Sequence, residues 1–432
     1  MPFLQKLEKE LEWMDMKSFW TIFNKNARSF NKKNNSRRVY LDSAASTKIN
    51  AQVLVAMTPF LTTDFGNPSS FHQEGVRARQ AVEKARTDIK NILNTKGGEV
   101  IFTSGGTEAN NLALLGTIKS YCKQIGQTTG TVLCSDIEHH SVLEPLKKQS
   151  SLLNNVVIKK IKVNHLGEFD LNHFKELLNK VDQPIIVSVG YANNEIGTIF
   201  PIKDIAKLIR KKRKETGSVW PLLHVDACQA PRFLSLDVTR LGVDLMTLNS
   251  SKIYGPKGVG LLYVGPKVQL EPVLSGGGQE FGLWPGTENV AGIVGLAKAL
   301  SLCATQKEKA GQQINKICQY LKNSLDSQIP NLVFHGLGQN RLPHNLNVTF
   351  LGVDSEQMAI ELDHHGFAVS VGSACSSNKK SDSHVLKALY GDKAPVESSV
   401  RFTLDSATTL SDIDELIKIL PPIIERHRSL NN

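Results

Sequence analysis

Short apolar runs rich in Val, Ile and Leu alternate with longer amphipathic segments along most of the chain. Runs of about four to eight apolar residues predict buried strands, and apolar residues at every third or fourth position predict helices. The predicted strands are 99–103, 131–134, 185–189, 221–226, 243–248 and 259–264. The predicted helices are 73–93, 109–121, 202–216 and one that opens near 137–142. This alternation favours an α/β fold, a mostly parallel sheet with helices on both faces.

The pattern changes near residue 303. Predicted helices now alternate with a second set of strands: helices 306–328, 355–365, 385–389 and 410–426, and strands 345–350, 368–371 and 399–403. These indicate a smaller α/β domain. We expect residues 61–302 to form the large domain and residues 39–60 and 303–432 to form the small one.

Residues 1–38 differ from the rest of the chain. Apolar residues repeat there at helical spacing, at positions 4, 7, 11 and 14, and a basic stretch follows from residue 24 to residue 38. The segment has no apolar core of a secretory signal, and acids at positions 8, 10, 12 and 15 argue against an organelle transit peptide. We expect a short helix and a flexible basic linker outside the two domains.

The composition indicates a water-soluble globular protein: 432 residues, 41% hydrophobic and 21% charged. No apolar run reaches the roughly 20 residues that a membrane span needs. The net charge of +10 is concentrated in residues 17–38 and 210–214, which we interpret as solvated surfaces, not as a nucleic-acid site. The six cysteines show no Cys-x-x-Cys pair and no metal-ligand spacing, so we expect reduced thiols, a cytoplasmic location and no metal.

Polar residues follow the predicted strands at their carboxyl ends, where such sheets bind ligands. Lys252 follows strand 243–248, and a lysine with a lowered pKa there is a nucleophilic amine. Ser104–Thr107 joins a strand to a helix, whose backbone N–H groups can bind phosphate. Asp226 ends a strand, where a carboxylate can pair with a protonated pyridine nitrogen. An exposed lysine, an ordinary turn and a helix cap are the simple alternatives, but together the three describe a site for pyridoxal 5′-phosphate (PLP).

Three further side chains are candidates: Asn194 and Gln229 lie just past predicted strand ends, and His139, with His140, opens a predicted helix. A flat imidazole can stack on a cofactor ring, and side-chain amides can bind a ring oxygen or a substrate. A surface histidine is the alternative for His139.

Several motifs occur in one order from residue 38 to the C-terminus: Tyr40–Ala45, Gly66–Ser70, Phe102–Glu108, Glu138–His139, Asn193–Gly197, His224–Gln229, Ser251–Pro256, Gly276–Gly278, Pro285–Asn289, Gly372–Cys375 and Val400–Arg401. As an ordered set they resemble the PLP-dependent cysteine desulfurases of the class V aminotransferase family. The resemblance implies PLP fold type I, with a mostly parallel seven-stranded sheet in the large domain, a smaller α/β domain and a homodimeric assembly.

The resemblance also implies roles for individual residues. Lys252 would hold PLP as a Schiff base and later remove the substrate Cα proton, His139 would stack on the ring, and Asp226 would pair with the ring nitrogen. Thr287 would reach the phosphate of the other subunit, and Arg401 would clamp the substrate carboxylate near Asn194. The full cofactor-binding set is Gly106, Thr107, His139, Asn194, Asp226, Gln229, Asn249, Ser251, Lys252 and Thr287.

The implied reaction converts L-cysteine to L-alanine, with Cys375 as the nucleophile that takes the sulfur as a persulfide. Cys375 lies in a polar loop, 373–383, and Lys379 and Lys380 nearby should favour its thiolate. The implied partner is an iron–sulfur scaffold or another sulfur acceptor, including the machinery of tRNA thiolation.

The chain departs from the family pattern in a few places. Ser251 stands where a histidine is usual, Trp284 and Phe281 stand where basic residues are common, and Ser43 replaces an aromatic residue. Three alternatives stay open: a selenocysteine lyase, whose motifs overlap, a class V aminotransferase-like enzyme without persulfide chemistry, and a PLP-fold partner protein without activity, which Ser251 and Trp284 suggest.

Overall fold

The computed structural model describes residues 38–126, 129–152, 156–371, 383–391 and 398–431. The larger part of the molecule is built on seven strands: β2 (Glu99–Thr103), β3 (Gly130–Ser135), β4 (Val156–Ile161), β5 (Pro184–Gly190), β6 (Leu222–Asp226), β7 (Leu245–Asn249) and β8 (Gly260–Val264). They form one sheet in the order β2-β8-β7-β6-β5-β3-β4. Only β8 runs antiparallel to its neighbours. The predicted mostly parallel seven-stranded sheet is confirmed.

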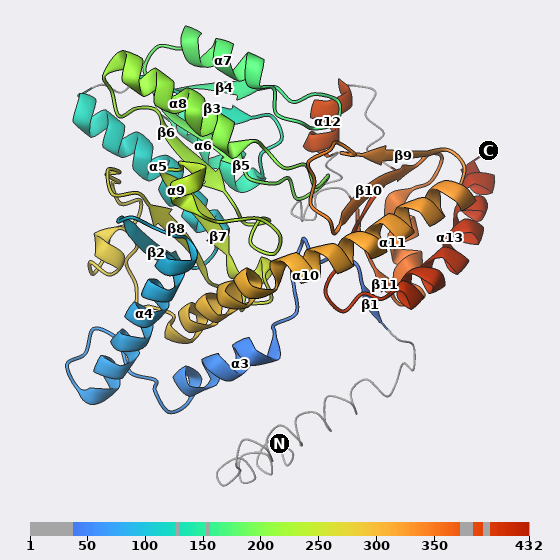
Figure 1. Ribbon diagram of the computed structural model, residues 1–432, viewed down its shortest axis with the longest axis horizontal. Helices are drawn as coiled ribbons and strands as arrows, with labels where there is room; N and C mark the ends of the chain where they lie inside the picture. The colour runs from blue at the N-terminus through green and yellow to red at the C-terminus, as the bar shows by residue number, and fades with distance from the viewer. Residues whose placement is uncertain (1–37, 127–128, 153–155, 372–382, 392–397, 432) are drawn as a thin grey trace.

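Helices cover both faces of this sheet (Figure 1). One face is covered by α4 (Gln73–Ile92), α7 (Leu171–Lys180), α8 (Ile202–Thr216) and α10 (Val290–Gln328), and the other by α5 (Gly106–Ile125) and α6 (His140–Leu152). Successive strand residues point to opposite faces of the sheet. Leu223 and Val225 therefore pack under α4, α7, α8 and α10, whereas Leu222 packs under α5 and α6. Burial on both faces explains why the strands read as continuous apolar runs.

The smaller part of the molecule has two sheets. One is antiparallel, in the order β12-β13-β10-β9, and the other pairs β1 with β11 in parallel. The strands are β1 (Val39–Tyr40), β9 (Leu332–His335), β10 (Asn345–Phe350), β11 (Phe367–Ala368), β12 (Ser370–Val371) and β13 (Ser399–Thr403). Helices α11 (Ser355–His364) and α13 (Leu410–Asn431) contribute to its core. This is the second α/β unit that the sequence predicts.

The remaining short elements connect these parts. They are α3 (Ala51–Met57), η2 (Thr58–Leu61), α9 (Val238–Leu241), η3 (Ser250–Lys252), η4 (Glu280–Gly282) and α12 (His384–Tyr390). Although α12 lies between β12 and β13 in sequence, its Val385 and Leu386 are buried in the core of the large sheet. No helix within the described ranges is both long and apolar enough to cross a membrane.

One predicted helix was wrong at its start. The sequence pattern predicts a helix from residue 306, whereas α10 begins at Val290. Gly292 and Gly295 weaken the helical signal there. A Cβ on Gly295 would lie 2.7 Å from the Met57 sulfur, so tertiary packing holds this turn helical. The domain boundary that we propose at residue 303 falls inside α10, and the predicted extension before residue 38 lies outside the described residues.

Candidate active site

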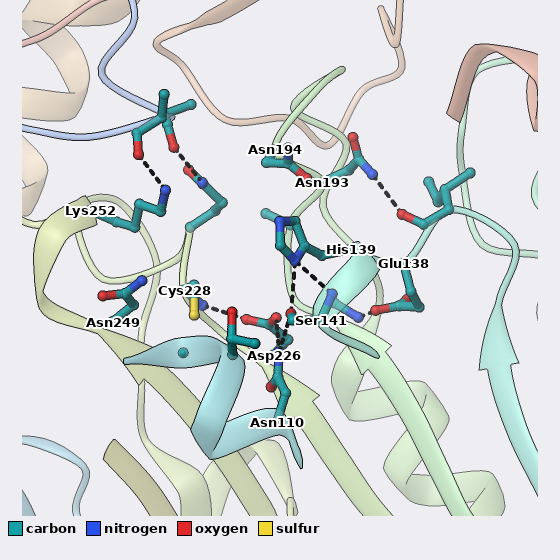
Figure 2. Close-up of a pocket in the computed structure, with 18 of the residues that line it drawn as sticks. Asn110, Glu138, His139, Ser141, Asn193, Asn194, Asp226, Cys228, Asn249 and Lys252 are labelled. Carbon is teal, nitrogen blue, oxygen red and sulfur yellow. Dashed lines mark hydrogen bonds between the residues drawn. The ribbon is translucent and has the colours of Figure 1, made fainter. Parts of the chain in front are cut away.

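A cavity of about 240 Å³ lies at the carboxyl ends of β5, β6 and β7, beside the N-terminus of α5. Figure 2 shows the side chains that reach it from separate elements. Of the predicted site residues, it brings together Gly106, Thr107, His139, Asn194, Asp226, Gln229, Asn249, Lys252 and Arg401. Ser251 and Thr287 do not line it, and Cys375 lies outside the described residues.

Lys252 ends the 3₁₀ turn η3, between the antiparallel strands β7 and β8. Its Nζ donates a hydrogen bond to the carbonyl oxygen of Ala45, in the first motif of the folded chain. The side chain of Asn249 caps the turn by accepting from the Ser251 N–H at 3.3 Å. The Ser251 hydroxyl also donates to Asn249 Oδ1, at 3.3 Å, which places it beside Asn249 instead of at the cavity wall.

The turn from β2 into α5 supplies backbone donors. Gly105 is the N-cap of this 20-residue helix, and Gly106 and Thr107 in its first turn line the cavity. A Cβ on Gly106 would lie 2.9 Å from the Cys228 sulfur and 3.3 Å from Asn249 Cβ, so only glycine lets the helix start this close to β6 and β7. The first turn of such a helix favours an anion through its unpaired N–H groups and its dipole.

The carboxylate of Asp226 is held by two neutral donors. Its Oδ1 accepts from the Cys228 N–H at 3.0 Å, and its Oδ2 accepts from Asn110 Nδ2 at 2.7 Å. Within the described residues, no lysine, arginine or histidine lies at ion-pair distance from it. Asn110 itself is fully buried, and its Oδ1 has no partner among the described groups. The pocket floor therefore offers a negative charge and a free acceptor to whatever binds there.

His139 stands at the start of α6, with its Nδ1 atom 2.7 Å from Ser141 Oγ and 3.1 Å from the Ser141 backbone nitrogen. Burial lowers the pKa of His139, although the charge of Asp226 opposes the shift. Burial therefore favours the neutral form of the imidazole. This lets it act as a flat wall and as a proton donor or acceptor.

Arg401 links the small sheet to the cavity. It lies on β13 and is 2% exposed. One guanidinium nitrogen, Nη2, donates to Asp42 Oδ1 at 2.7 Å and the other, Nη1, donates to the Asn194 carbonyl at 3.0 Å. Its Nε is buried without a partner in the described part of the chain. The ion pair orients the guanidinium, and Nε remains as a donor.

Sequence reasoning missed several groups that shape this cavity, and only some had a readable signal. Asp42 and Glu138 lie inside quoted motifs, but we assigned them no role. Asn110 is a polar residue on the apolar side of α5, which is a usable signal. The role of Ser141 could not be predicted from its sequence neighbours, because it depends on the contact of its hydroxyl with Asn110 at 2.8 Å. Ser43 is buried, bonds Arg232 and the Leu404 carbonyl, and does not line the cavity.

The profile of one protein family, described as aminotransferase class V, matches residues 39–416 of the chain. The chain belongs to the class V aminotransferases. Two of its curated relatives are a cysteine desulfurase IscS from Dictyoglomus turgidum and a cysteine desulfurase IscS 1 from Archaeoglobus fulgidus. The first is 39% identical over 395 residues, 91% of this chain and 96% of the relative. The second is 39% identical over 393 residues, 91% of this chain and 98% of the relative.

Solved structures agree with this assignment. A NifS-like protein superposes with a TM-score of 0.81 at 31% identity, covering 90% of this chain and 100% of that one. A NifS-like protein from Rickettsia africae gives 0.79 at 29% identity over the same shares. The resemblance to cysteine desulfurases and the fold type are therefore confirmed for this class V aminotransferase.

Proposed function

We propose that this protein is a PLP-dependent cysteine desulfurase, converting L-cysteine to L-alanine with the sulfur captured as a persulfide on Cys375. The observation that carries the proposal is the convergence of Lys252, Asp226 and the first turn of α5 on one cavity. An amine, a counter-charge and an anion site at these positions match the three handles of PLP: aldehyde, pyridine nitrogen and phosphate. The relatives named cysteine desulfurase support the choice of substrate.

The cavity fits PLP on its own chemistry. Asp226 has no cationic partner among the described side chains, as expected of a carboxylate that would hold a protonated ring nitrogen. Asn110 Oδ1 is an orphaned buried acceptor, which costs about 1–3 kcal/mol unless a ligand or water satisfies it. The lack of a side chain at Gly106 lets the first turn of α5 lie against Cys228 and Asn249 at the cavity, where a helix N-terminus favours a phosphate.

The residues of the chain would then divide the work. When bound, PLP supplies an electron-withdrawing ring that stabilises negative charge at the substrate Cα. Lys252 would supply the tethering amine and a base for the Cα proton. Asp226 would pair with a protonated ring nitrogen, and His139 would wall one side of the cavity. Arg401 Nε and the Asn194 side chain would bind the substrate carboxylate.

Sulfur transfer needs a thiolate. The Cys375 thiolate would attack the substrate sulfur, forming the S–S bond as the C–S bond breaks. The electron pair of that bond would stay on the substrate carbon, which takes a proton, and return of the Cα proton by Lys252 would complete alanine. Burial raises the pKa of Cys134, Cys303 and Cys318 to about 11, and it raises the pKa of Cys228 well above its usual value. These four are therefore poor nucleophiles, which supports Cys375.

The decisive experiment compares two cysteine variants. After exposure to L-cysteine, mass spectrometry should find one extra sulfur on Cys375 in the natural protein. Cys375→Ser should keep cofactor absorbance but form no persulfide and release no sulfide. Cys228→Ser is the matched control, because Cys228 lines the cavity yet is assigned no transfer role. Full sulfide release by Cys375→Ser would reject the persulfide mechanism and favour an aminotransferase-like enzyme.

Three finer points belong to the same proposal. We propose a homodimer, in which the exposed Thr287 reaches the phosphate site of the other subunit. Mixing Lys252→Ala with Thr287→Ala subunits should then restore activity at one site per mixed dimer. We also propose a cytoplasmic role in sulfur delivery to an iron–sulfur scaffold or to tRNA thiolation. Relative turnover of cysteine and selenocysteine separates the desulfurase from a selenocysteine lyase.

A further inference from the structure

A chain of buried hydrogen bonds joins Asp226 to His139 in the candidate site (Figure 2). Asn110 Nδ2, on α5, lies 2.7 Å from Asp226 Oδ2 on β6 and 2.8 Å from Ser141 Oγ on α6. Ser141 Oγ in turn lies 2.7 Å from His139 Nδ1. Asn110 is fully buried and Ser141 is 7% exposed, so the described protein groups, not bulk water, set this arrangement.

The donor and acceptor capacities of the four groups fix the direction of each hydrogen bond. An ionised carboxylate only accepts, so the amide of Asn110 must turn its NH₂ group toward Asp226. The same NH₂ group donates its second hydrogen to Ser141 Oγ. Having accepted there, the Ser141 hydroxyl directs its own hydrogen to His139 Nδ1. The Ser141 backbone N–H, which can only donate, also points at this nitrogen, at 3.1 Å.

We propose that Asn110 and Ser141 are positioning residues that hold neutral His139 in the tautomer with its proton on Nε2. Two donors face Nδ1, so Nδ1 must offer a lone pair, and the single proton of a neutral ring then belongs to Nε2. The inference deepens the proposed function and rests on it: at the cavity wall, His139 presents an N–H donor, not a lone pair, to the reacting groups. Asn110 links this tautomer of His139 to Asp226, because its NH₂ group donates both to the Asp226 carboxylate and to the Ser141 hydroxyl.

Other titratable groups also face His139. Asp226 on β6 raises its pKa, whereas Lys252 in η3, His140 on α6 and His384 on α12 lower it, and burial lowers it most. These groups act on the total charge of the ring. Selection between the two nitrogens follows from Ser141, whose hydroxyl and backbone N–H both face Nδ1.

The test is nitrogen NMR of the full-length protein labelled with ¹⁵N-histidine, as purified and after removal of PLP. His139→Gln identifies the His139 signals by their loss. In the natural protein we expect Nδ1 to resonate as an unprotonated nitrogen and Nε2 as a protonated one. A protonated Nδ1 in the neutral ring would overturn the proposal. This measurement is made on the natural protein, so it does not depend on whether a variant folds.

Variants then test the relay. Ser141→Ala should raise the titration midpoint of His139 by roughly 0.4 to 1 pKa unit, the effect of losing one hydrogen bond to the neutral ring. Asn110→Ala should produce a similar shift, and the double variant no more than the larger single one, because both act through one hydroxyl. Ser141→Thr keeps the hydroxyl and should restore the natural midpoint.

The matched control is Ser120→Ala, a buried serine on α5 outside the chain of hydrogen bonds. It should leave the His139 midpoint unchanged. Additive shifts from Asn110→Ala and Ser141→Ala, or an equal shift from Ser120→Ala, would refute the relay. Because the readout is the ring nitrogen and not turnover, a protein without desulfurase activity could still show the Nε2–H tautomer, and the two proposals can fail separately.

Discussion

At the scale of single residues, Asp226 is the carboxylate that we propose as the partner of a cationic ring nitrogen in the cavity. Its two oxygens accept from Asn110 and from the Cys228 N–H, and these neutral donors orient the carboxylate without cancelling its charge. A carboxylate in this setting stabilises a cation placed against it, and the proposed cation is the protonated ring nitrogen.

We therefore predict that Asp226→Asn lowers kcat/KM by about 10- to 100-fold, the loss of one charge-assisted hydrogen bond. Asparagine has nearly the same shape but cannot stabilise a protonated ring nitrogen. Steady-state alanine formation measures the effect. Asp204→Asn, at an exposed position in the first turn of α8, should change kcat/KM by less than about twofold. Natural kcat/KM in Asp226→Asn would remove Asp226 from the proposed mechanism.

Glu138 is a buried acid with a separate effect on stability. Burial raises its pKa from 4.5 to about 7, although Ser135 and the Gly190 N–H both donate to its Oε1. Between these two pH values the folded protein keeps a proton that the unfolded chain has lost. The free energy of unfolding contributed by Glu138 therefore falls as the pH rises through this window.

Glu138→Gln removes that dependence, because an amide stays neutral while its oxygen can accept both hydrogen bonds. We predict that the variant gains about 3 kcal/mol relative to the natural protein between about pH 4.5 and pH 8. Urea unfolding across this range measures the difference. Glu144→Gln, at an exposed position on α6, should show no such trend. A constant difference for Glu138→Gln would mean that Glu138 is already ionised at pH 5.

The residues that sequence reasoning found and missed differ in a physical way. Lys252, Asp226 and the Gly106 turn follow apolar strands, and strand ends in a parallel sheet converge on one edge, so their proximity could be predicted. Asn110 and Ser141 gain their places in the site from contacts between separate elements, including their own contact across 31 positions of sequence. No local pattern encodes such a pair, which appears only when α5 and α6 pack side by side.

At the scale of elements, the start of α5 decides whether an anion can approach. Its first turn lies against β6 and β7, where Gly106 meets Cys228 and Asn249. Protein interiors are packed so densely that one added methyl group displaces its neighbours or strains the backbone.

We predict that Gly106→Ala weakens PLP binding by at least about tenfold, because the added Cβ would sit 2.9 Å from the Cys228 sulfur and must displace the turn. Fluorescence titration of the PLP-free protein gives the Kd. Gly311→Ala is the matched control, since its Cβ on α10 meets only Phe233 at 3.8 Å. It should leave the Kd unchanged and stabilise the fold by about 0.5–1 kcal/mol. Unchanged PLP affinity in Gly106→Ala would mean that the anion site is elsewhere.

The bounds of helices and strands were predicted well where the apolar periodicity is clear. They were predicted poorly where tertiary packing overrides the local sequence preference. The bounds of α8, β10 and β13 match the sequence prediction. The first turns of α10 were missed, since Gly295 allows close approach to Met57 and Gly292 allows close approach to the Asn289 side chain, at a cost in helix propensity. Propensity is a weak signal at such positions, because tertiary contacts decide the conformation.

At the scale of the whole molecule, four consecutive residues connect the two α/β units to the cavity. Asp42 pairs with Arg401, Ser43 bonds Arg232, and the carbonyls of Ala44 and Ala45 accept from Gln229 and Lys252. The segment comes directly after β1, which pairs with the small unit. A shift of the small unit would therefore change the contacts of Lys252 with Ala45 and of Arg401 with Asp42 together.

A second long-range link lies behind the anion site. Arg86 on α4 and Glu280 in η4 form an ion pair at 2.9 Å, with side chains only 6% and 3% exposed. Glu280 Oε2 also accepts from the Phe102 N–H at 2.8 Å, on the strand that leads into α5. This pair fixes the start of the loop that carries Thr287 against the strand that precedes Gly106.

We predict that Glu280→Gln destabilises the protein by about 3–5 kcal/mol, because it removes the buried counter-charge of Arg86 and leaves only the solvent-screened Glu83. Urea unfolding measures the change. Glu83→Gln is the matched control on the same arginine: Glu83 lies 3.3 Å from Arg86 but is 58% exposed, so its loss should cost under about 1 kcal/mol. Replacing both partners, Arg86→Met with Glu280→Leu, should recover most of the stability, since no buried charge is left unpaired. Equal losses from Glu280→Gln and Glu83→Gln would show that Arg86 is solvated in solution, and the link between η4 and β2 would then not depend on this pair.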